Sequence, residues 1–106
     1  MDTLLPGTLD LLILKVLSRG PLHGYGIAQV LGQSTDQFLQ VGEGSLYPAL
    51  QRLLVNEWVS SEWRASETGR RARFYTLSEI GRSRLAEEER RFDRMVKAIR
   101  MVLRPA

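Results

Sequence analysis

The chain contains no cysteine and only one histidine, His23. Without cysteine it cannot form disulfides, thiolate metal sites or a cysteine nucleophile, and it suits a reducing compartment. No second histidine or aspartate stands near His23 at the spacing of metal ligands, so we expect a packing role for this residue, no metal site and no cofactor. Nucleophile–base and phosphate-loop motifs are also missing, which indicates that the protein is not an enzyme.

Long apolar runs are absent too. The longest, from Leu9 to Leu17, is interrupted by Asp10 and Lys15 and falls short of the roughly 20 residues that cross a bilayer. The N-terminal stretch Met1-Asp2-Thr3 carries an acidic residue where a secretory signal would be basic. We therefore expect no membrane partner and a cytoplasmic location.

Lysine is scarce, because Lys15 and Lys97 are the only two among 15 basic residues. The remaining basic residues are arginines, whose forked guanidinium group matches phosphates and guanine edges. Several of them gather between Arg64 and Arg84, and the net charge is +3. With 106 residues, 43% of them hydrophobic and 25% charged, the chain has the size of one globular domain and permits a polyanionic partner.

Apolar spacing predicts two helices in the first third of the chain. Thr8 can cap a helix from Leu9, and Leu11 and Leu14 widen its apolar surface, so we expect a second body to pack there. A short second helix is expected from Ile27 to about residue 31, followed by a polar loop over residues 33–40.

A third helix is predicted after the two glycines at 42 and 44. Its buried face is formed by Leu46, Ala49, Leu50, Leu53 and Leu54. Pro48 is compatible with a helix in its first turn, where the missing N–H has no helical partner. The outward side would then carry Ser45, Gln51 and Arg52, with Tyr47 at the boundary.

Two strands joined by a turn are predicted over residues 58–64 and 70–77. The second strand is basic near the turn and apolar near Leu77, which indicates a hairpin with a packed base and a projecting tip. Trp58 and Trp63 are expected to be packing groups, although an exposed Trp63 beside a dimer cleft could stack on a planar effector.

A last helix is predicted from a cap at Ser78, with apolar spacing that persists for about 25 residues, or roughly 37 Å. Its heptad pattern has a weak point at Glu88, so dimerisation through this seam would need support from the first helix. The predicted dimer interface consists of Leu11, Leu14, Leu85, Phe92, Met95, Ile99 and Val102.

This order of elements is typical of a winged helix-turn-helix module. The expected fold is mainly α with a two-stranded β-hairpin, divided into a DNA-binding domain over residues 1–78 and a C-terminal dimerisation helix over residues 79–106. Four blocks carry a closer resemblance: GTLDLLIL at 7–14, GPLHGYGI at 20–27, EGSLYPAL at 43–50 and RRARFY at 70–75. In these blocks the chain resembles the PadR family of bacterial transcriptional regulators, of the short type with a single C-terminal helix.

The resemblance implies a homodimeric, repressor-type protein that binds double-stranded DNA at a pseudo-palindromic operator. It also implies a small hydrophobic or aromatic effector as a further partner.

Candidate DNA contacts come from the third helix and the hairpin. Gln51 and Arg52 could read adenine and guanine edges, while Ser45 and Tyr47 could hold phosphates; the alternative is a polar helix face, with Tyr47 as a packing residue. Tyr25 could hold a phosphate beside the second helix or belong to the core.

Three arginines beside the turn are the candidate wing contacts, namely Arg70, Arg71 and Arg73. The alternative is a solvated strand end paired with Glu62 or Glu67. If so, the chain could be a winged-helix module for protein–protein interaction that does not bind DNA. RNA binding is a weaker alternative, because Phe74 and Tyr75 are needed at the hairpin base.

Overall fold

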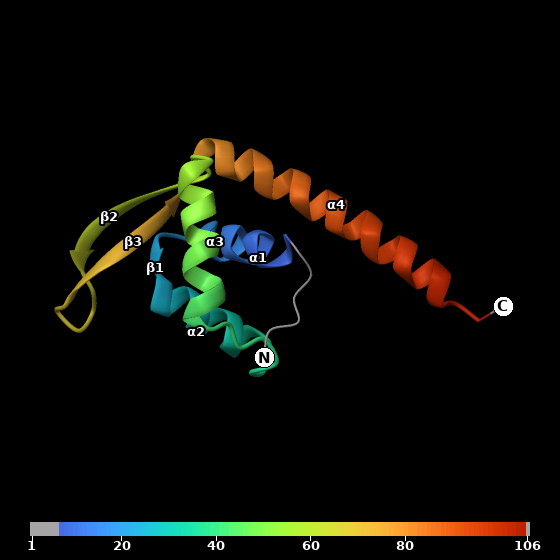
Figure 1. Ribbon diagram of the computed structural model, residues 1–106, viewed down its shortest axis with the longest axis horizontal. Helices are drawn as coiled ribbons and strands as arrows, with labels where there is room; N and C mark the ends of the chain where they lie inside the picture. Colours follow the sequence, from blue (N-terminus) through green and yellow to red (C-terminus); the bar gives the residue numbers. More distant parts are fainter. Residues whose placement is uncertain (1–6, 106) are drawn as a thin grey trace.

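The computed structural model describes residues 7–105. Helices and strands follow in the order α1 (Thr8–Leu17), β1 (Leu22–His23), α2 (Gly24–Ser34), α3 (Glu43–Val55), β2 (Val59–Ala65), β3 (Arg71–Leu77) and α4 (Glu79–Leu103). Three short helices and the base of a small sheet form the body, and the outer part of the β2–β3 hairpin and α4 project to opposite sides of it (Figure 1). The predicted mainly α fold with a hairpin and a long last helix is therefore confirmed.

The sheet has three antiparallel strands in the order β1-β3-β2. Strands β2 and β3 pair along their whole length, from Val59 opposite Leu77 to Ala65 opposite Arg71. The two-residue strand β1 adds to the other edge of β3, with Leu22 opposite Tyr75. The hairpin prediction was thus incomplete, because a strand of two residues has no alternation by which it could be recognised.

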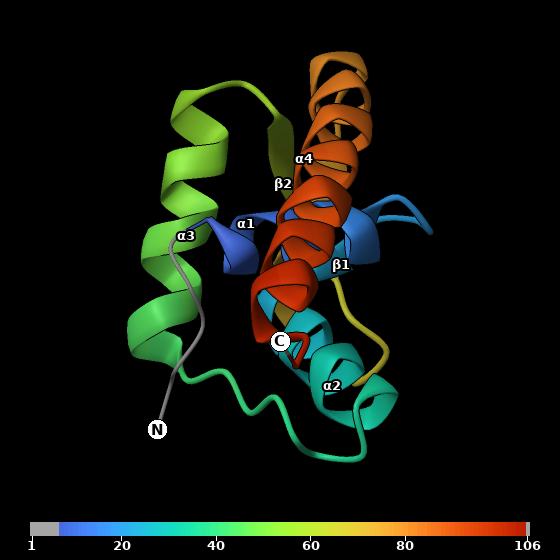
Figure 2. The same ribbon diagram turned by 90° about the vertical axis from the view of Figure 1, so that its right-hand side faces the viewer.

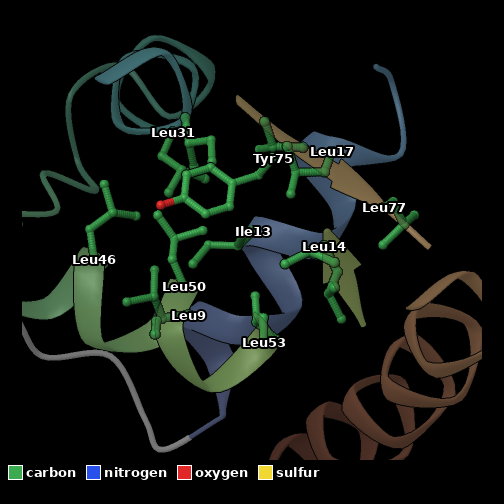
Figure 3. Packing of buried hydrophobic residues seen from close by; sticks show 14 of the residues in the cluster. Leu9, Ile13, Leu14, Leu17, Leu31, Leu46, Leu50, Leu53, Tyr75 and Leu77 are labelled. Atoms are coloured by element: carbon green, nitrogen blue, oxygen red, sulfur yellow. The ribbon is translucent and has the colours of Figure 1, made fainter. Parts of the chain in front are cut away.

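Helix α1 lies at the centre of the core and contacts α2, α3, β3 and α4. The predicted inward residues of α3 are buried or, for Leu54, half-buried. The Tyr75 ring points from β3 into the cluster between the helices (Figure 3). The core also takes in Leu14, which is completely buried, and Leu85, which is 7% exposed. Both were predicted at a dimer interface, and this part of the prediction is wrong because the chain's own elements cover them.

The helix starts differ from the expected ones in three places. Helix α1 begins at Thr8 itself, after Gly7, and has no side-chain cap. Helix α2 begins three residues earlier than expected, at Gly24, because His23 caps it. Helix α3 begins at Glu43, which places Pro48 in the second turn rather than the first. The carbonyl of exposed Gly44 consequently lacks the N–H that residue 48 would otherwise donate.

The predicted cap at Ser78 is confirmed, since its hydroxyl accepts a hydrogen bond from the N–H of Gly81 at 3.0 Å. Near its start α4 buries Gly81 and Leu85, and Lys15 of α1 pairs with Glu89 at 3.4 Å. Beyond this point α4 extends outward, and the longest dimension of the molecule is 57 Å. Seen from the α4 side, α3 runs along one edge, with α1 between it and α4 (Figure 2).

Helix α4 begins at Glu79, and residues 1–6 and 106 of the two expected domains lie outside the described part of the chain. Within residues 7–105, no helix combines the length and apolar character needed to cross a membrane.

Candidate nucleic-acid interface

Helix α3 presents a polar edge to solvent. Its four buried residues, among them Leu46 and Leu50, fix the helix against α1, and this packing leaves Tyr47, Gln51 and Arg52 exposed. Ser45 lies in the first turn and is half-buried. The predicted outward side of the third helix therefore lies on the surface.

Arg52 has a partner inside the chain. Its Nη2 donates to Oδ1 of Asp10 on α1 at 2.8 Å, and the arginine side chain remains 57% exposed. An exposed ion pair of this kind contributes about 0–1 kcal/mol. The guanidinium group can therefore exchange Asp10 for another acceptor at small cost.

The hairpin has two faces, and the register of its strands determines on which face each side chain lies. Val59, Leu77 and Tyr75 point into the core from its base. Because side chains alternate along a strand, the same face carries Trp63 opposite Arg73 farther along, and then Ala65 opposite Arg71. We call this side the inner face of the wing.

The outer face carries a different arginine. Arg64 lies 4.5 Å from the centroid of the Phe74 ring and 3.4 Å from a carboxylate oxygen of Glu62. One basic side chain of the hairpin is thus satisfied locally, away from the inner face.

Arg73 is held in place on the inner face. Its Nε donates to the Ser61 hydroxyl at 2.9 Å, and its guanidinium carbon lies 5.8 Å from the centroid of the Tyr75 ring. Burial raises the pKa of the Tyr75 phenol, and the charge of Arg73 opposes this rise only in part. Tyr75 is therefore a neutral support for the arginine at physiological pH.

A recess of about 650 Å³ separates the inner face of the wing from α2 and α3. We call it the wing recess. Its aromatic walls are exposed: Tyr25 is 70%, Tyr47 45% and Trp63 59% accessible. The basic side chains that line it are Arg70, Arg71 and Arg73. Three elements distant in sequence thus form one concave surface with aromatic and cationic groups.

Helix α2 and the Tyr47 side chain of α3 approach closely at this recess. A Cβ atom on Gly24 would come within 2.8 Å of the Tyr47 hydroxyl, so the glycine lets the Tyr47 ring lie directly against α2. Tyr25 and Ser45 border a second hollow, of about 670 Å³, between α2 and the start of α3. Tyr25 therefore lies on the surface and does not belong to the core.

The turn of the wing is tied back to the body by His23. Its Nδ1 accepts from the N–H of Gly26 at 2.9 Å, and its Nε2 lies 3.4 Å from Oε1 of Glu67. The pKa of the Glu67 carboxyl is lowered, chiefly by a backbone hydrogen bond and then by the hydrogen bond with His23. At the end of the turn, Gly69 has a φ of 85° and its N–H bonds the carbonyl of Ser66 at 2.9 Å.

The predicted site residues thus form two groups. Tyr25, Tyr47 and the three wing arginines meet around the wing recess, and Ser45 lies beside Tyr25 at the adjoining hollow. Gln51 and Arg52 form the second group, on the exposed edge of α3 outside the recess. Within residues 7–105, Arg70 and Arg71 have no ion-pair partner. The same part of the chain contains no cluster of three or more metal-ligating side chains.

Two features of this surface were not predicted from the sequence. One is the contact between His23 and the wing turn, since nothing in the sequence connects residues 44 positions apart. The other is the position of Trp63, which borders the wing recess, a surface that includes no residue of α4. The expectation that Trp63 packs in the interior is wrong, because the face of β2 that carries it no longer contacts the core at residue 63.

An exposed helix edge next to a hairpin with unpaired arginines is the arrangement of a winged helix-turn-helix regulator that binds DNA. Residues 13–87 match the model of the Transcriptional regulator PadR-like family. The chain belongs to this family. Membership confirms the resemblance found in the sequence and the expectation of a DNA-binding transcriptional regulator that is not an enzyme.

Solved structures agree with this assignment. A transcriptional regulator from Clostridium thermocellum is 26% identical and superposes with a TM-score of 0.85, covering 92% of this chain and 95% of that one. A PadR family transcription regulator from Clostridium difficile is 27% identical with a TM-score of 0.78, covering 92% and 100%. Bacillus subtilis PadR, solved in complex with operator DNA, is 26% identical with a TM-score of 0.67, covering 76% of this chain and 46% of that protein.

Proposed function

We propose that the protein is a homodimeric, sequence-specific repressor that inserts α3 into the major groove and places its wing on the DNA backbone or in the minor groove. The observation that carries the proposal is the orientation of Arg71 and Arg73, which face the same recess as Tyr47 of α3. Arginines without acidic partners on a concave surface are suited to phosphates. The complex of Bacillus subtilis PadR with operator DNA supports the same role.

In this proposal one group of site residues reads bases and the other holds phosphates. Gln51 and Arg52 on the edge of α3 read base edges, because Gln pairs with adenine and Arg with guanine through two hydrogen bonds. Tyr25, Ser45, Tyr47 and the wing arginines Arg70, Arg71 and Arg73 position the protein on phosphates. Loss of the first group should therefore blunt sequence preference, and loss of the second should weaken binding to every duplex.

The proposed dimer interface is the outer part of α4. Phe92, Met95, Ile99 and Val102 are exposed there, at heptad spacing along one side of the helix. Leu11 is half-buried and lines a hollow of about 160 Å³ with Phe92 and Lys15. A second copy covering this seam would make residues 79–106 the dimerisation part and residues 1–78 the DNA-binding part.

A two-fold symmetric dimer presents two α3 helices to DNA. They fit successive major grooves when their centres are about 34–36 Å apart or a multiple of that distance, so the operator is pseudo-palindromic.

A cytoplasmic location is part of this proposal, because such a regulator acts where the chromosome is. The proposal also includes a small aromatic effector as a further partner. A screen for aromatic ligands that raise the thermal midpoint of the protein tests for it.

Selection of bound duplexes from a random DNA pool tests the proposal. We expect enrichment of a palindromic motif whose affinity falls by orders of magnitude between about 50 and 200 mM salt. Failure to enrich any motif, together with no salt-dependent affinity, would contradict it and would favour a winged-helix module that binds another protein.

A further inference from the structure

Trp63 is an exposed aromatic side chain next to the wing arginines, in a recess that Glu67 also lines. It stands opposite Arg73 in the β2–β3 register and borders the wing recess, with Tyr25 and Tyr47 on the other side. More than half of its surface, 59%, is accessible. Trp63, Tyr25 and Tyr47 are exposed together around one concave surface, and such a group of exposed aromatic side chains indicates a binding site.

The second tryptophan provides a contrast. Trp58 is half-buried, packs against the core, and lies 5.1 Å under the guanidinium group of Arg84. Packing within the chain therefore explains why a large aromatic side chain stands at position 58. Within residues 7–105, no such packing explains Trp63, which has neither a cation over its ring nor a place in the core.

A DNA strand presents two kinds of surface to such a recess. Its phosphates are anionic and suit Arg71 and Arg73, whereas its deoxyribose rings present C–H groups between the phosphates. On the wing, an indole ring lies beside guanidinium groups in the same way, through the pairing of Trp63 with Arg73. The alternation of charged and apolar groups on the protein therefore matches that of the backbone.

We propose that Trp63 binds DNA directly, with its indole ring packed against a deoxyribose of the strand whose phosphates are held by Arg71 and Arg73. This inference rests on the proposed DNA-binding function. It adds a contact that releases no counterions, because the indole is uncharged. Its contribution to affinity should accordingly be the same at every salt concentration.

The first measurement uses tryptophan fluorescence of the full chain with the substitution Trp58→Phe, which leaves Trp63 as the only tryptophan. We expect addition of duplex DNA to quench the emission and shift it to shorter wavelength as the ring leaves water. An unchanged spectrum at DNA concentrations that saturate binding would overturn the inference.

The second measurement compares affinities across salt. Trp63→Ala should weaken duplex binding about tenfold, as expected for a central aromatic contact, and log K should fall with log salt in parallel with the wild type. Trp63→Phe should restore part of the affinity. Unchanged affinity, or a flattened salt slope that shows an effect through Arg73, would overturn the inference.

Two controls separate the possible failures. The thermal midpoint of Trp63→Ala should stay close to that of the wild type, because more than half of the side chain surface is exposed. Wild-type protein that binds no duplex would overturn the proposed function and this inference with it. Wild-type binding with a silent Trp63 would overturn the inference alone.

Discussion

Nε2 of His23 lies 3.4 Å from Oε1 of Glu67, 44 residues farther along the chain. On the other side of the ring, Nδ1 accepts the N–H of Gly26 at 2.9 Å and so caps α2. An acceptor nitrogen carries no proton, so the neutral ring has its proton on Nε2, facing the carboxylate. A single side chain thus joins the start of the helix-turn-helix to the turn of the wing.

Replacing His23 should lower the free energy of unfolding more than replacing Glu67. His23→Ala deletes the cap of α2, and we expect the free energy of unfolding to fall by about 1 kcal/mol. Glu67→Gln keeps the cap and should leave the free energy of unfolding nearly unchanged, because the carboxylate is exposed. Urea denaturation of the two variants distinguishes these roles, and equal losses would show that the cap is not the stabilising part.

Gly81 is the point where α4 packs against the body. A Cβ atom at this position would collide with the carbonyl oxygen of Trp58 and would come within 2.6 Å of Leu77 Cδ1. We expect Gly81→Ala to destabilise the protein by about 1–3 kcal/mol, as overpacking does.

Gly44→Ala is the matched control, because a Cβ atom on this helical glycine would have nothing within 4 Å. Alanine favours a helix over glycine by about 0.5–1 kcal/mol, so Gly44→Ala should be neutral or stabilising. Thermal denaturation compares the two variants. If Gly81→Ala were as stable as Gly44→Ala, the packing of α4 on Trp58 would be assigned incorrectly.

The pair between Arg52 and Asp10 should compete with DNA. Asp10→Asn releases the guanidinium group and removes a negative charge beside α3, so we expect affinity for a selected duplex to rise about threefold with little change in stability. In an Arg52→Ala background most of this gain should disappear, which a double-mutant cycle measures. A gain of equal size without Arg52 would show that the pair plays no part in binding.

The seam on α4 should control the oligomeric state. Ile99→Glu or Phe92→Glu places a charge among exposed apolar residues, and we expect monomers with poor affinity for DNA. Lys97→Glu, two residues from Ile99 and outside the heptad positions, should remain dimeric. Sedimentation of the three variants provides the test. A dimeric Ile99→Glu protein would place the interface elsewhere.

Much of the fold could be predicted because its helices carry regular apolar spacing. Leu46, Leu50 and Leu53 alone indicate how α3 packs. Helix α2 was harder, since Gly24 and Gly26 normally weaken a helix. Here Gly24 lies against the Tyr47 ring, which only the folded chain brings near, and Gly26 lies against the side chain of Leu22, four residues earlier. Leu14 was misassigned for a related reason: the second body expected beside α1 includes α4 of the same chain.

The residue types of the site could also be predicted, but not their grouping. Arginines beside a turn indicated a wing, yet the direction in which Arg73 or Arg64 points depends on the strand register, which a basic strand does not specify. The position of Trp63 depends on the same register. The pairing of Arg52 with Asp10 requires α1 and α3 to be packed first.

The central claim is that DNA binds on the side formed by α3 and the inner face of the wing. Affinity for a selected duplex, measured between about 50 and 200 mM salt, tests it when the double variant Arg71→Ala, Arg73→Ala is compared with Arg64→Ala on the outer face. We expect the double variant to reduce the slope of log K against log salt by about two, and Arg64→Ala to retain the wild-type slope. A wild-type slope in the double variant, or a loss confined to Arg64→Ala, would contradict the account.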